Sequence, residues 1–389
     1  MATRSAAAYT RLEDSVAAGQ HLAAQILEKL ENAQPDAVIV FASSRFDYAA
    51  LLSALQHGCQ PKVLVGASSA GEFTQSERGE GTACALAIHA PTMRFNLGLG
   101  TGLSHDRAAA AGHLVASFEG IDTHDYQYRA AIIMSDGLAG HFDDLVEQLT
   151  VLTAGTYQFV GGGAGDDGHF ARTHVFAGVT AYTDAVVGLE VLSAKPFGLG
   201  VEHGWTPASE PLRVTESQGM RLAALNGFPA VEAFEEHAAA TNQRFDRSAP
   251  LPFFLHNILG IDTGHGYRLR VPLSVNDDGS LSCAAEIPRG ATVSIMKASA
   301  LSSTDAAAAA ARTAVGGMKN EKPGAALFFD CVATRLRMGE VFGFELEAVA
   351  EALSGADLVG CNTYGQIARG DGQFGGFHNC TAVVFVLPA

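Results

Sequence analysis

Polar side chains follow glycine-rich turns at three places in the sequence, at 65–72, 160–166 and 359–366. In open α/β sheets, ligands bind beside the carboxyl ends of the strands, and glycine lets a ligand approach the backbone closely. We therefore expect one shared pocket for a small molecule where these turns meet. The candidate ligand-binding residues lie in the turns or at the ends of the preceding strands: Ser44, Arg45, Ser68, Ser69, Glu72, Asp136, Gly163, Asp166, Cys331, Arg335, Asn362, Thr363, Tyr364 and Gln366.

The usual catalytic motifs are missing from the sequence. A G-x-G-x-x-G match begins at Gly163, but two aspartates inside it would repel the pyrophosphate of a dinucleotide. GxxxxGK[ST], GxSxG and HExxH do not occur, so nucleotide hydrolysis, α/β-hydrolase chemistry and zincin chemistry lose their usual support. Glu72 and Asp136 could act as paired carboxylates, although no motif ties either of them to a proton transfer.

Two histidines could ligate a haem iron. His203 lies beside the only tryptophan, and His256 follows the apolar run 252–255. A neutral imidazole binds iron, and an apolar pocket with one basic ligand suits a haem that binds a gas. The alternative for both residues is a core histidine that is hydrogen-bonded to the backbone. The sequence thus makes haem b a candidate cofactor, with His203 or His256 as its axial ligand.

The composition is that of a soluble globular protein with an acidic surface. Of the 389 residues, 48% are hydrophobic, and 41 acidic side chains against 25 Lys and Arg give a formal charge of −16. This charge disfavours nucleic acid and anionic membrane surfaces as partners. Apolar runs such as 382–388 are far shorter than the roughly 18 residues that cross a bilayer. Six scattered cysteines without a CxxC pair favour a reduced, cytoplasmic protein without a zinc or disulfide framework.

An internal repeat indicates the fold class. Three segments each run from a β-rich stretch, through a helix with apolar residues at n, n+3, n+4 and n+7, to a glycine-rich turn and another strand. The helices span 48–55, 142–149 and 346–353. Ala-rich helices that begin near Ser104 and Ser303 extend the similarity. The sequence therefore predicts an α/β fold of repeated helix-strand-helix-strand-strand units, which form sheets flanked by helices.

The stretch 195–300 has a different amino-acid composition from the repeat units and suggests two consecutive domains. It holds eight of the thirteen prolines, several short strands and a hairpin-like turn at 276–279. We expect an N-terminal domain at 1–230 with two repeat units. The C-terminal domain at 231–389 then contains a strand-rich insert followed by the third unit.

Ten short motifs in order over residues 35–388 resemble those of the FIST family of sensory proteins, which are built from a FIST N-terminal and a FIST C-terminal domain. The motifs are GASSAGE (66–72), DGLAGHFDDL (136–145), VGGGAGDD (160–167), HGWTP (203–207), VT (214–215), NGFPA (226–230), NDDGSL (276–281), FDC (329–331), CNTYGQ (361–366) and HNCT (378–381). Two positions depart from the family pattern. Gln366 replaces the usual acid of TYGE, and Val332 to Arg335 follow FDC where a glycine-arginine pair is common. Both departures bear on the charge preference of a ligand pocket.

The resemblance implies an intracellular ligand-sensing protein rather than an enzyme. Bacterial members of the family are often encoded beside or fused to histidine kinases, cyclic-di-nucleotide enzymes or chemotaxis components. Some members, the NosP proteins, bind haem and sense nitric oxide, and others have been suggested to bind small metabolites. We recognise no output domain in the sequence, so we expect the signal to pass to a separate signalling protein such as a histidine kinase or a cyclic-di-nucleotide enzyme.

The leading hypothesis is a sensor that binds a small ligand between its two halves, either a metabolite or a haem that senses nitric oxide. An enzyme with Cys331 or Ser44 as nucleophile, near Arg335 and Asp136, is the alternative from another class, and it needs a base that the motifs do not supply. A scaffold for protein interactions, with a vestigial pocket, is the third hypothesis.

Overall fold

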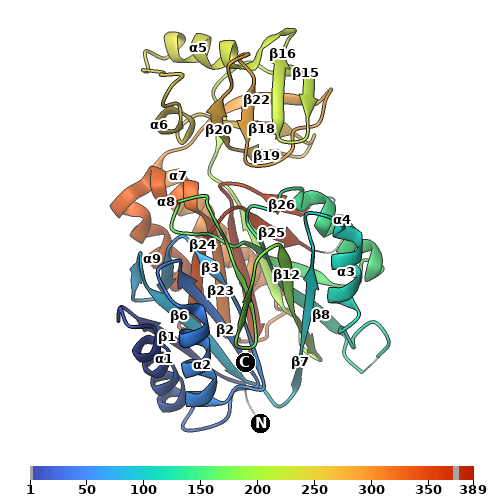
Figure 1. Cartoon of the computed structure of the whole chain (residues 1–389), viewed down its shortest axis with the longest axis vertical. Helices are drawn as coiled ribbons and strands as arrows, with labels where there is room; N and C mark the ends of the chain where they lie inside the picture. Colours follow the sequence, from blue (N-terminus) through green and yellow to red (C-terminus); the bar gives the residue numbers. More distant parts are fainter. Residues whose placement is uncertain (1–2, 124, 371–375) are drawn as a thin grey trace.

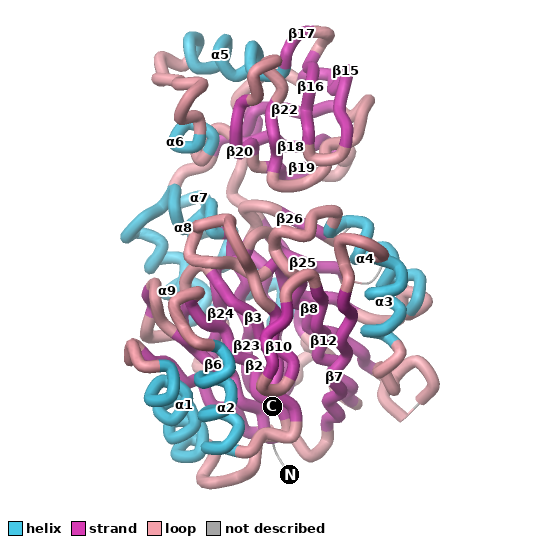
Figure 2. Tube along the Cα trace, in the orientation of Figure 1, coloured by secondary structure: helices cyan, strands magenta, loops and turns pink. Residues whose placement is uncertain are grey.

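The computed structural model describes residues 3–123, 125–370 and 376–389. Within these residues the strands form three sheets of six strands and one of nine. Figure 1 shows two parts, a body built from the three six-stranded sheets and a smaller β-rich part above it, which we call the cap (residues 206–297). In Figure 2 the helices of the body lie outside its strands, so the mixed α/β architecture with helix-flanked sheets is confirmed.

The first body sheet contains the first repeat unit. Its elements are β1 (Arg4–Thr10), α1 (Ser15–Lys29), β2 (Ala37–Ser43), α2 (Tyr48–Cys59), β3 (Val63–Ser69) and β6 (Ala83–His89). β2 and β3 are parallel and are joined by α2, whereas β6 lies antiparallel between β1 and β2. Asp14 and Asp47 each accept a hydrogen bond from a first-turn N–H group and so fix the starts of α1 and α2.

The second and third units repeat this order. The second unit contains β7 (Met93–Thr101), α3 (Arg107–Val115), β8 (Tyr128–Ser135), α4 (Phe142–Leu152), β9 (Gln158–Gly163) and β12 (Ala185–Ser193). The third contains β13 (Gly198–Glu202), α7 (Ala300–Gly317), β23 (Pro323–Cys331), α8 (Val332–Met338), the 3₁₀ turn η1 (Gly339–Phe342), α9 (Gly343–Ala352), β24 (Asp357–Thr363) and β27 (Ala382–Pro388). In both units the paired parallel strands are followed by an antiparallel one, as in the first.

The start of one Ala-rich helix differs from the prediction. α3 begins after Asp106, whose side chain accepts a hydrogen bond from the N–H of Ala109 at 2.9 Å, close to the expected start. α7 begins earlier than expected, because Ser299 and Ser302 form a reciprocal capping box. Ser303, the predicted start, therefore lies inside the helix. Several serines in a row offered alternative caps, and only the tertiary structure selects one.

Each unit donates a short hairpin to the sheet of another unit. The hairpin β4 (Glu72–Thr74) and β5 (Arg78–Gly79) of the first unit pairs with β24 of the third sheet. The hairpin β10 (Val175–Ala177) and β11 (Thr180–Tyr182) pairs with β3 of the first sheet. The hairpin β25 (Gln366–Arg369) and β26 (Phe377–His378) pairs with β9 of the second sheet. The three exchanges close a ring through the body.

The inner faces of the three sheets meet in one apolar core. Phe41 of the first sheet and Phe329 of the third pack edge to face, with ring centroids 5.7 Å apart, and Met134 of the second sheet lies in the same core. The central strands are covered by this core on one face and by helices on the other. Strands buried on both faces read as continuous apolar runs, which explains why the repeat is visible in the sequence.

The cap is inserted into the third unit, between β13 and α7. Its elements are β14 (Thr206–Pro207), β15 (Leu212–Gln218), β16 (Arg221–Leu225), β17 (Phe228–Pro229), α5 (Ala230–Ala240), α6 (Leu251–Phe254), β18 (Ile258–Asp262), β19 (Tyr267–Arg270), β20 (Pro272–Val275), β21 (Leu281–Cys283) and β22 (Thr292–Lys297). The predicted turn at 276–279 joins the antiparallel strands β20 and β21. Residue 231, where we expected the second domain to begin, lies in α5 inside the cap.

No helix in the described part of the chain is both long and apolar enough to cross a membrane. All six cysteines are free and buried.

Candidate functional site

The three glycine-rich turns meet in the body, but they leave no pocket at their meeting point. Ser68, Gly163 and Thr363 lie together there, and the hollow between them has no room for a water molecule. The glycines inside the strands serve packing instead. A Cβ added at Gly66 or Gly161 would lie 1.9 Å from a carbonyl oxygen of the neighbouring parallel strand. The structure therefore brings the turns together as expected and fills the space between them.

Ser44 and Arg45 follow strand β2 and make contacts at the surface. The Ser44 side chain is exposed, and its hydroxyl donates a hydrogen bond to Asp167. Arg45 is also exposed and lies 3.7 Å from the carboxylate of Glu13. Neither residue lines the two large pockets described below, and the partner of Ser44 is a carboxylate rather than an imidazole. Ser44 is thus placed as a structural residue and not as an activated nucleophile.

Two buried aspartates organise the loop between β9 and β12. The carboxylate of Asp136 accepts from the Thr173 hydroxyl at 2.5 Å and from the Asp184 N–H at 2.6 Å. The carboxylate of Asp166 accepts from the backbone N–H groups at 170–172 and from the Tyr364 hydroxyl. These bonds lower the pKa of Asp166, although burial opposes them. Both carboxylates are therefore engaged in hydrogen bonds that hold the loop in place.

Gln366 is fully buried and holds two segments of the third unit together. In the orientation that satisfies its neighbours, the amide oxygen accepts from the Cys331 N–H at 3.1 Å, and the amide nitrogen donates to the carbonyls of His378 and Thr381 at 3.3 Å. An amide can both donate and accept, whereas a carboxylate can only accept. The replacement of the usual acid therefore supports these contacts and does not place a charge in a ligand pocket.

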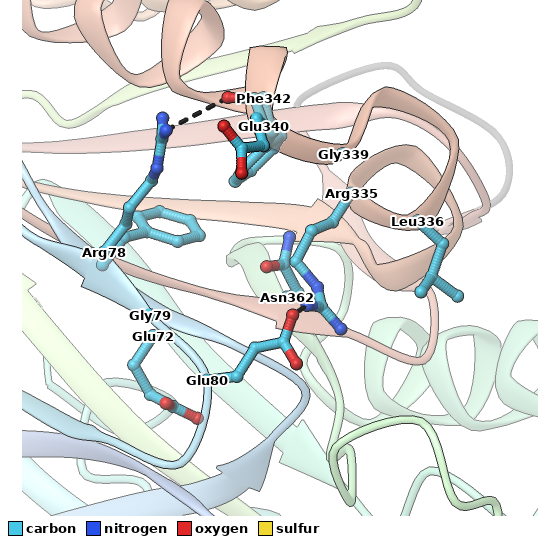
Figure 3. Close-up of a pocket in the computed structure, with 11 residues that line it drawn as sticks. Glu72, Arg78, Gly79, Glu80, Arg335, Leu336, Gly339, Glu340, Phe342 and Asn362 are labelled. Atoms are coloured by element: carbon cyan, nitrogen blue, oxygen red, sulfur yellow. Dashed lines mark hydrogen bonds and ion pairs between the residues drawn. The ribbon is translucent and has the colours of Figure 1, made fainter.

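A polar pocket of about 550 Å³ lies between the hairpin β4–β5 and the segment from α8 to η1 (Figure 3). Its lining residues, which define the polar pocket below, are Glu72, Phe73, Arg78, Gly79, Glu80, Arg335, Leu336, Gly339, Glu340, Phe342 and Asn362. Three of the predicted ligand-binding residues, Glu72, Arg335 and Asn362, meet here. Glu72 accepts hydrogen bonds from Ser69 and Thr82 at 2.5 and 2.6 Å, and burial raises its pKa to about 7.

A second pocket of about 520 Å³, the cleft pocket, lies between the cap and the body. Its cap wall is mostly apolar and includes Met220, Leu255, Val271, Leu273 and Ala284. Its body wall comes from motifs that are far apart in the sequence: Gly137, Leu138 and Gly140 of DGLAGH, Cys331 of FDC, Tyr364 and Gly365 of CNTYGQ, and Asn379 of HNCT. Four of the sequence motifs thus converge on one apolar cleft.

Two polar groups stand out in the wall of the cleft pocket. Asn379 is 1% exposed, and its side-chain oxygen has no hydrogen-bond partner in the structure. Cys331 is 4% exposed, and a hydrogen bond from the Cys380 thiol lowers its pKa to about 7 in spite of burial. Buried polar atoms are normally paired, so the unpaired oxygen of Asn379 indicates a place where a donor on a ligand fits.

Charged contacts beside the cleft pocket connect the cap to helix α4 of the body. Arg270 of the cap is 1% exposed and donates to the Asp143 carboxylate at 2.6 Å and to the Glu286 carbonyl at 2.9 Å. Burial lowers the pKa of Arg270 to about 10, and Asp143 opposes that effect. His141 forms a second contact with the carboxylate of Glu286. We call the pair Arg270–Asp143 the latch.

The two histidines proposed as iron ligands do not fit a haem. The Nε2–H of His203 donates to the Tyr267 carbonyl at 2.9 Å, and its Nδ1 accepts from the Trp205 N–H at 3.4 Å. The cavity beside His203 holds only about 10 Å³, enough for about one water molecule. His256 is exposed and is not part of the cleft pocket wall. In the described residues, no group of three or more His, Cys, Asp or Glu could hold a metal ion.

Sequence reasoning missed the cap side of the cleft pocket and the latch. Leu273 and Ala284 belong to short strands outside the repeat or to the turns beside them, so no periodic pattern marks them. Arg270 reads as one of two arginines in an alternating strand, and only the fold shows that its side chain is buried. Asn379 lies in one of the family motifs, and that motif was the signal that could have found it.

Two family models match the chain, the FIST N domain over residues 36–227 and the FIST C domain over residues 230–369. No curated protein matches the sequence significantly. Among solved structures, a cyanuric acid hydrolase from A. caulinodans is 6% identical over 99% of both chains, with a TM-score of 0.32. A second structure, titled "Cyanuric acid hydrolase: evolutionary innovation by structural concatenation", is 10% identical over 100% of both chains, with a TM-score of 0.29. These two likenesses are too low to support an argument about this chain. The two family matches, in contrast, cover most of its length, and the chain belongs to the FIST family.

Proposed function

We propose that this protein is a ligand sensor that binds a small, largely apolar molecule in the cleft pocket. The observation that carries the proposal is the unpaired side-chain oxygen of Asn379, a residue that is 1% exposed and lies in the wall of this pocket. A ligand with one N–H or O–H donor pairs that oxygen while its apolar part covers Val271, Leu273 and Ala284. FIST domains are associated with small-ligand sensing in signalling, which agrees with this site.

The position of the pocket suggests how binding could become a signal. Its two walls belong to different parts of the molecule, so the ligand favours the arrangement in which the cap lies against the body. A ligand shifts such an equilibrium only by its difference in affinity for the two arrangements, and a tenfold difference corresponds to about 1.4 kcal/mol. We propose that this shift alters the surface offered to a separate signalling protein, such as a histidine kinase or a cyclic-di-nucleotide enzyme.

Filling the cleft tests the proposal. Nile red, a neutral apolar dye, should bind the wild-type protein at one saturable site with a rise in fluorescence. Ala284→Phe places an aromatic ring in the cleft and should weaken dye binding at least about tenfold. Ala240→Phe is the matched control, since Ala240 lies exposed at the end of α5 and away from the pocket. Unchanged dye affinity in Ala284→Phe would place the site elsewhere and refute the proposal.

The natural ligand can be sought with the same pair of variants. Small molecules released by denaturing the purified wild-type protein are compared by mass spectrometry with those released from Ala284→Phe and Ala240→Phe. The cleft ligand is the compound that the wild-type and Ala240→Phe proteins retain and Ala284→Phe does not.

Cys331 favours a second candidate function, reaction with an electrophilic ligand. Its thiol lines the cleft pocket, and a hydrogen bond from Cys380 lowers its pKa to about 7, which favours the reactive thiolate form. Iodoacetamide should therefore alkylate Cys331 faster than a cysteine whose pKa is raised by burial, when both are compared at neutral pH. Cys59 is the control, because burial raises its pKa to about 11. If mass spectrometry finds Cys331 no faster than Cys59 at neutral pH, Cys331 is not a nucleophile.

A further inference from the structure

The polar pocket has the features of a second binding site, separate from the cleft pocket. Helix α8 contributes to both pockets: Val332 and Ala333 line the cleft pocket, Arg335 lines the polar pocket, and Leu336 lines both. The opposite wall of the polar pocket is the donated hairpin β4–β5, so the pocket exists only because the hairpin exchange brings the first and third units together. Figure 3 shows these two walls facing each other.

Asn362 lies in this pocket with an unmatched hydrogen-bonding capacity. Its side chain is 1% exposed, and neither its amide nitrogen nor its amide oxygen has a partner. Leaving both atoms unpaired in the interior opposes folding. The two atoms together match a group that offers one acceptor and one donor, such as an amide.

Arg335 lies next to Asn362 and is incompletely neutralised. Its side chain is 13% exposed, and its Nε is buried without a partner. Nη1 forms an ion pair with Glu80, whose side chain is 66% exposed and therefore free to swing into solvent. Burial lowers the pKa of Arg335, and the charges of Glu72 and Tyr364 only partly oppose that effect. A carboxylate from outside can take the place of Glu80.

Asn362 and Arg335 both pack closely against Gly71. A Cβ at Gly71 would lie 2.7 Å from the Oδ1 of Asn362 and 3.3 Å from the Cδ of Arg335, so glycine is needed where these side chains pack. Gly71 also has a φ of 135°, which favours glycine. The Glu72 carboxyl accepts hydrogen bonds from Ser69 and Thr82, and its charge raises the pKa of Arg335.

We propose that the polar pocket binds a small organic acid that carries an amide group next to its carboxylate. The carboxylate pairs with Arg335 in place of Glu80, because an arginine fork matches a carboxylate with two parallel hydrogen bonds. The amide of the ligand pairs with both free atoms of Asn362. The aromatic rings of Phe73 and Phe342 cover its apolar part.

Two matched probes test this proposal: N-acetylglycine, and N-acetylglycinamide, in which an uncharged amide replaces the carboxylate. Isothermal titration calorimetry should detect saturable binding of N-acetylglycine and much weaker binding of the amide. Glu80→Gln frees Arg335 and should tighten N-acetylglycine binding about fivefold. Glu77→Gln is the control, because Glu77 is also an exposed glutamate of this hairpin region but pairs with Arg11 outside the pocket.

A third variant separates binding from folding. Asn362→Leu should weaken N-acetylglycine binding at least about tenfold while its melting temperature stays equal to or rises above that of the wild type, since it removes two unpaired polar atoms. A lower melting temperature would show that Asn362 serves the fold, and would overturn the proposal. The proposal also fails if neither the wild type nor Glu80→Gln binds N-acetylglycine up to about 10 mM. Ala284→Phe should leave this binding unchanged, so the two sites can fail independently.

Discussion

At the scale of single residues, two asparagines mark the two pockets. Asn362 and Asn379 are both 1% exposed and both carry side-chain atoms without a partner. An unpaired buried polar group lowers the free energy of unfolding by about 1–3 kcal/mol, so such a group does not stabilise the fold. Asp166 shows the contrast, because its carboxylate is paired with three backbone N–H groups and a tyrosine hydroxyl. The unpaired atoms of Asn362 and Asn379 belong to residues in pocket walls, whereas the carboxylate of Asp166 is paired within the fold.

Glu72 makes stability depend on pH. Burial raises its pKa from 4.5 to about 7, so between these values the folded protein binds more protons than the unfolded chain. The free energy of unfolding therefore falls as pH rises through this window, by about 3 kcal/mol from this group. Glu72→Gln should remove that part of the slope, measured by urea unfolding at a series of pH values. The buried pair Asp330 and Glu345, whose pKa values are also raised, contributes a slope of the same sign that remains in the variant.

An unchanged slope in Glu72→Gln would contradict this account. Only the slope is compared, because the glutamine amide cannot accept the hydrogen bonds of Ser69 and Thr82 as the carboxyl does.

At the scale of elements, the latch decides how firmly the cap is attached to α4. Arg270 lies in β19 of the cap, and Asp143 lies in the first turn of α4. A carboxylate is also favoured there because the N-terminal end of a helix carries positive partial charge. The Arg270 side chain is 1% exposed and that of Asp143 is 24% exposed, and the pair adjoins the cleft pocket, whose wall includes Phe142 and Val271. Contacts at the latch and in the cleft pocket therefore act on the same interface.

Asp143→Ala should lower the free energy of unfolding by about 3–5 kcal/mol, because it leaves the Arg270 charge buried and unpaired. Asp144→Ala is the matched control in the same helical turn. Asp144 pairs with Arg107 at 2.8 Å, but its side chain is 45% exposed, so its loss should cost less than about 1 kcal/mol. Urea unfolding of the two variants checks the difference. Equal losses would show that the latch contributes no more than a surface ion pair, and Arg270→Met should rescue part of the loss in Asp143→Ala.

At the scale of the whole molecule, the sequence predicts those features of the fold that depend on local patterns of apolar and polar residues. The continuous apolar runs and the helical spacing predict the order of strands and helices in each unit, because each strand pair is buried on both faces. The hairpins β4–β5, β10–β11 and β25–β26 could not be predicted, since their strands are short and pair with another unit. The glycine-rich turns and strand ends likewise identify Cys331, Asn362 and Tyr364 as candidate site residues. Their distribution over two pockets could not be predicted, because it depends on how the cap and the exchanged hairpins pack.

The hairpin exchange also sets the order in which a nascent chain can complete its structure. Strand β9 ends at Gly163, yet its partner β25 begins at Gln366, and the strand β27 that closes the third sheet ends at Pro388. Until β25 and β27 leave the ribosome, β9 is an open edge and one side of the central core has no cover. Open edges and bare apolar faces associate with other chains. A growing polypeptide that has not yet reached β25 and β27 must therefore be kept apart from its neighbours, and the synthesis of these two strands ends that vulnerable period.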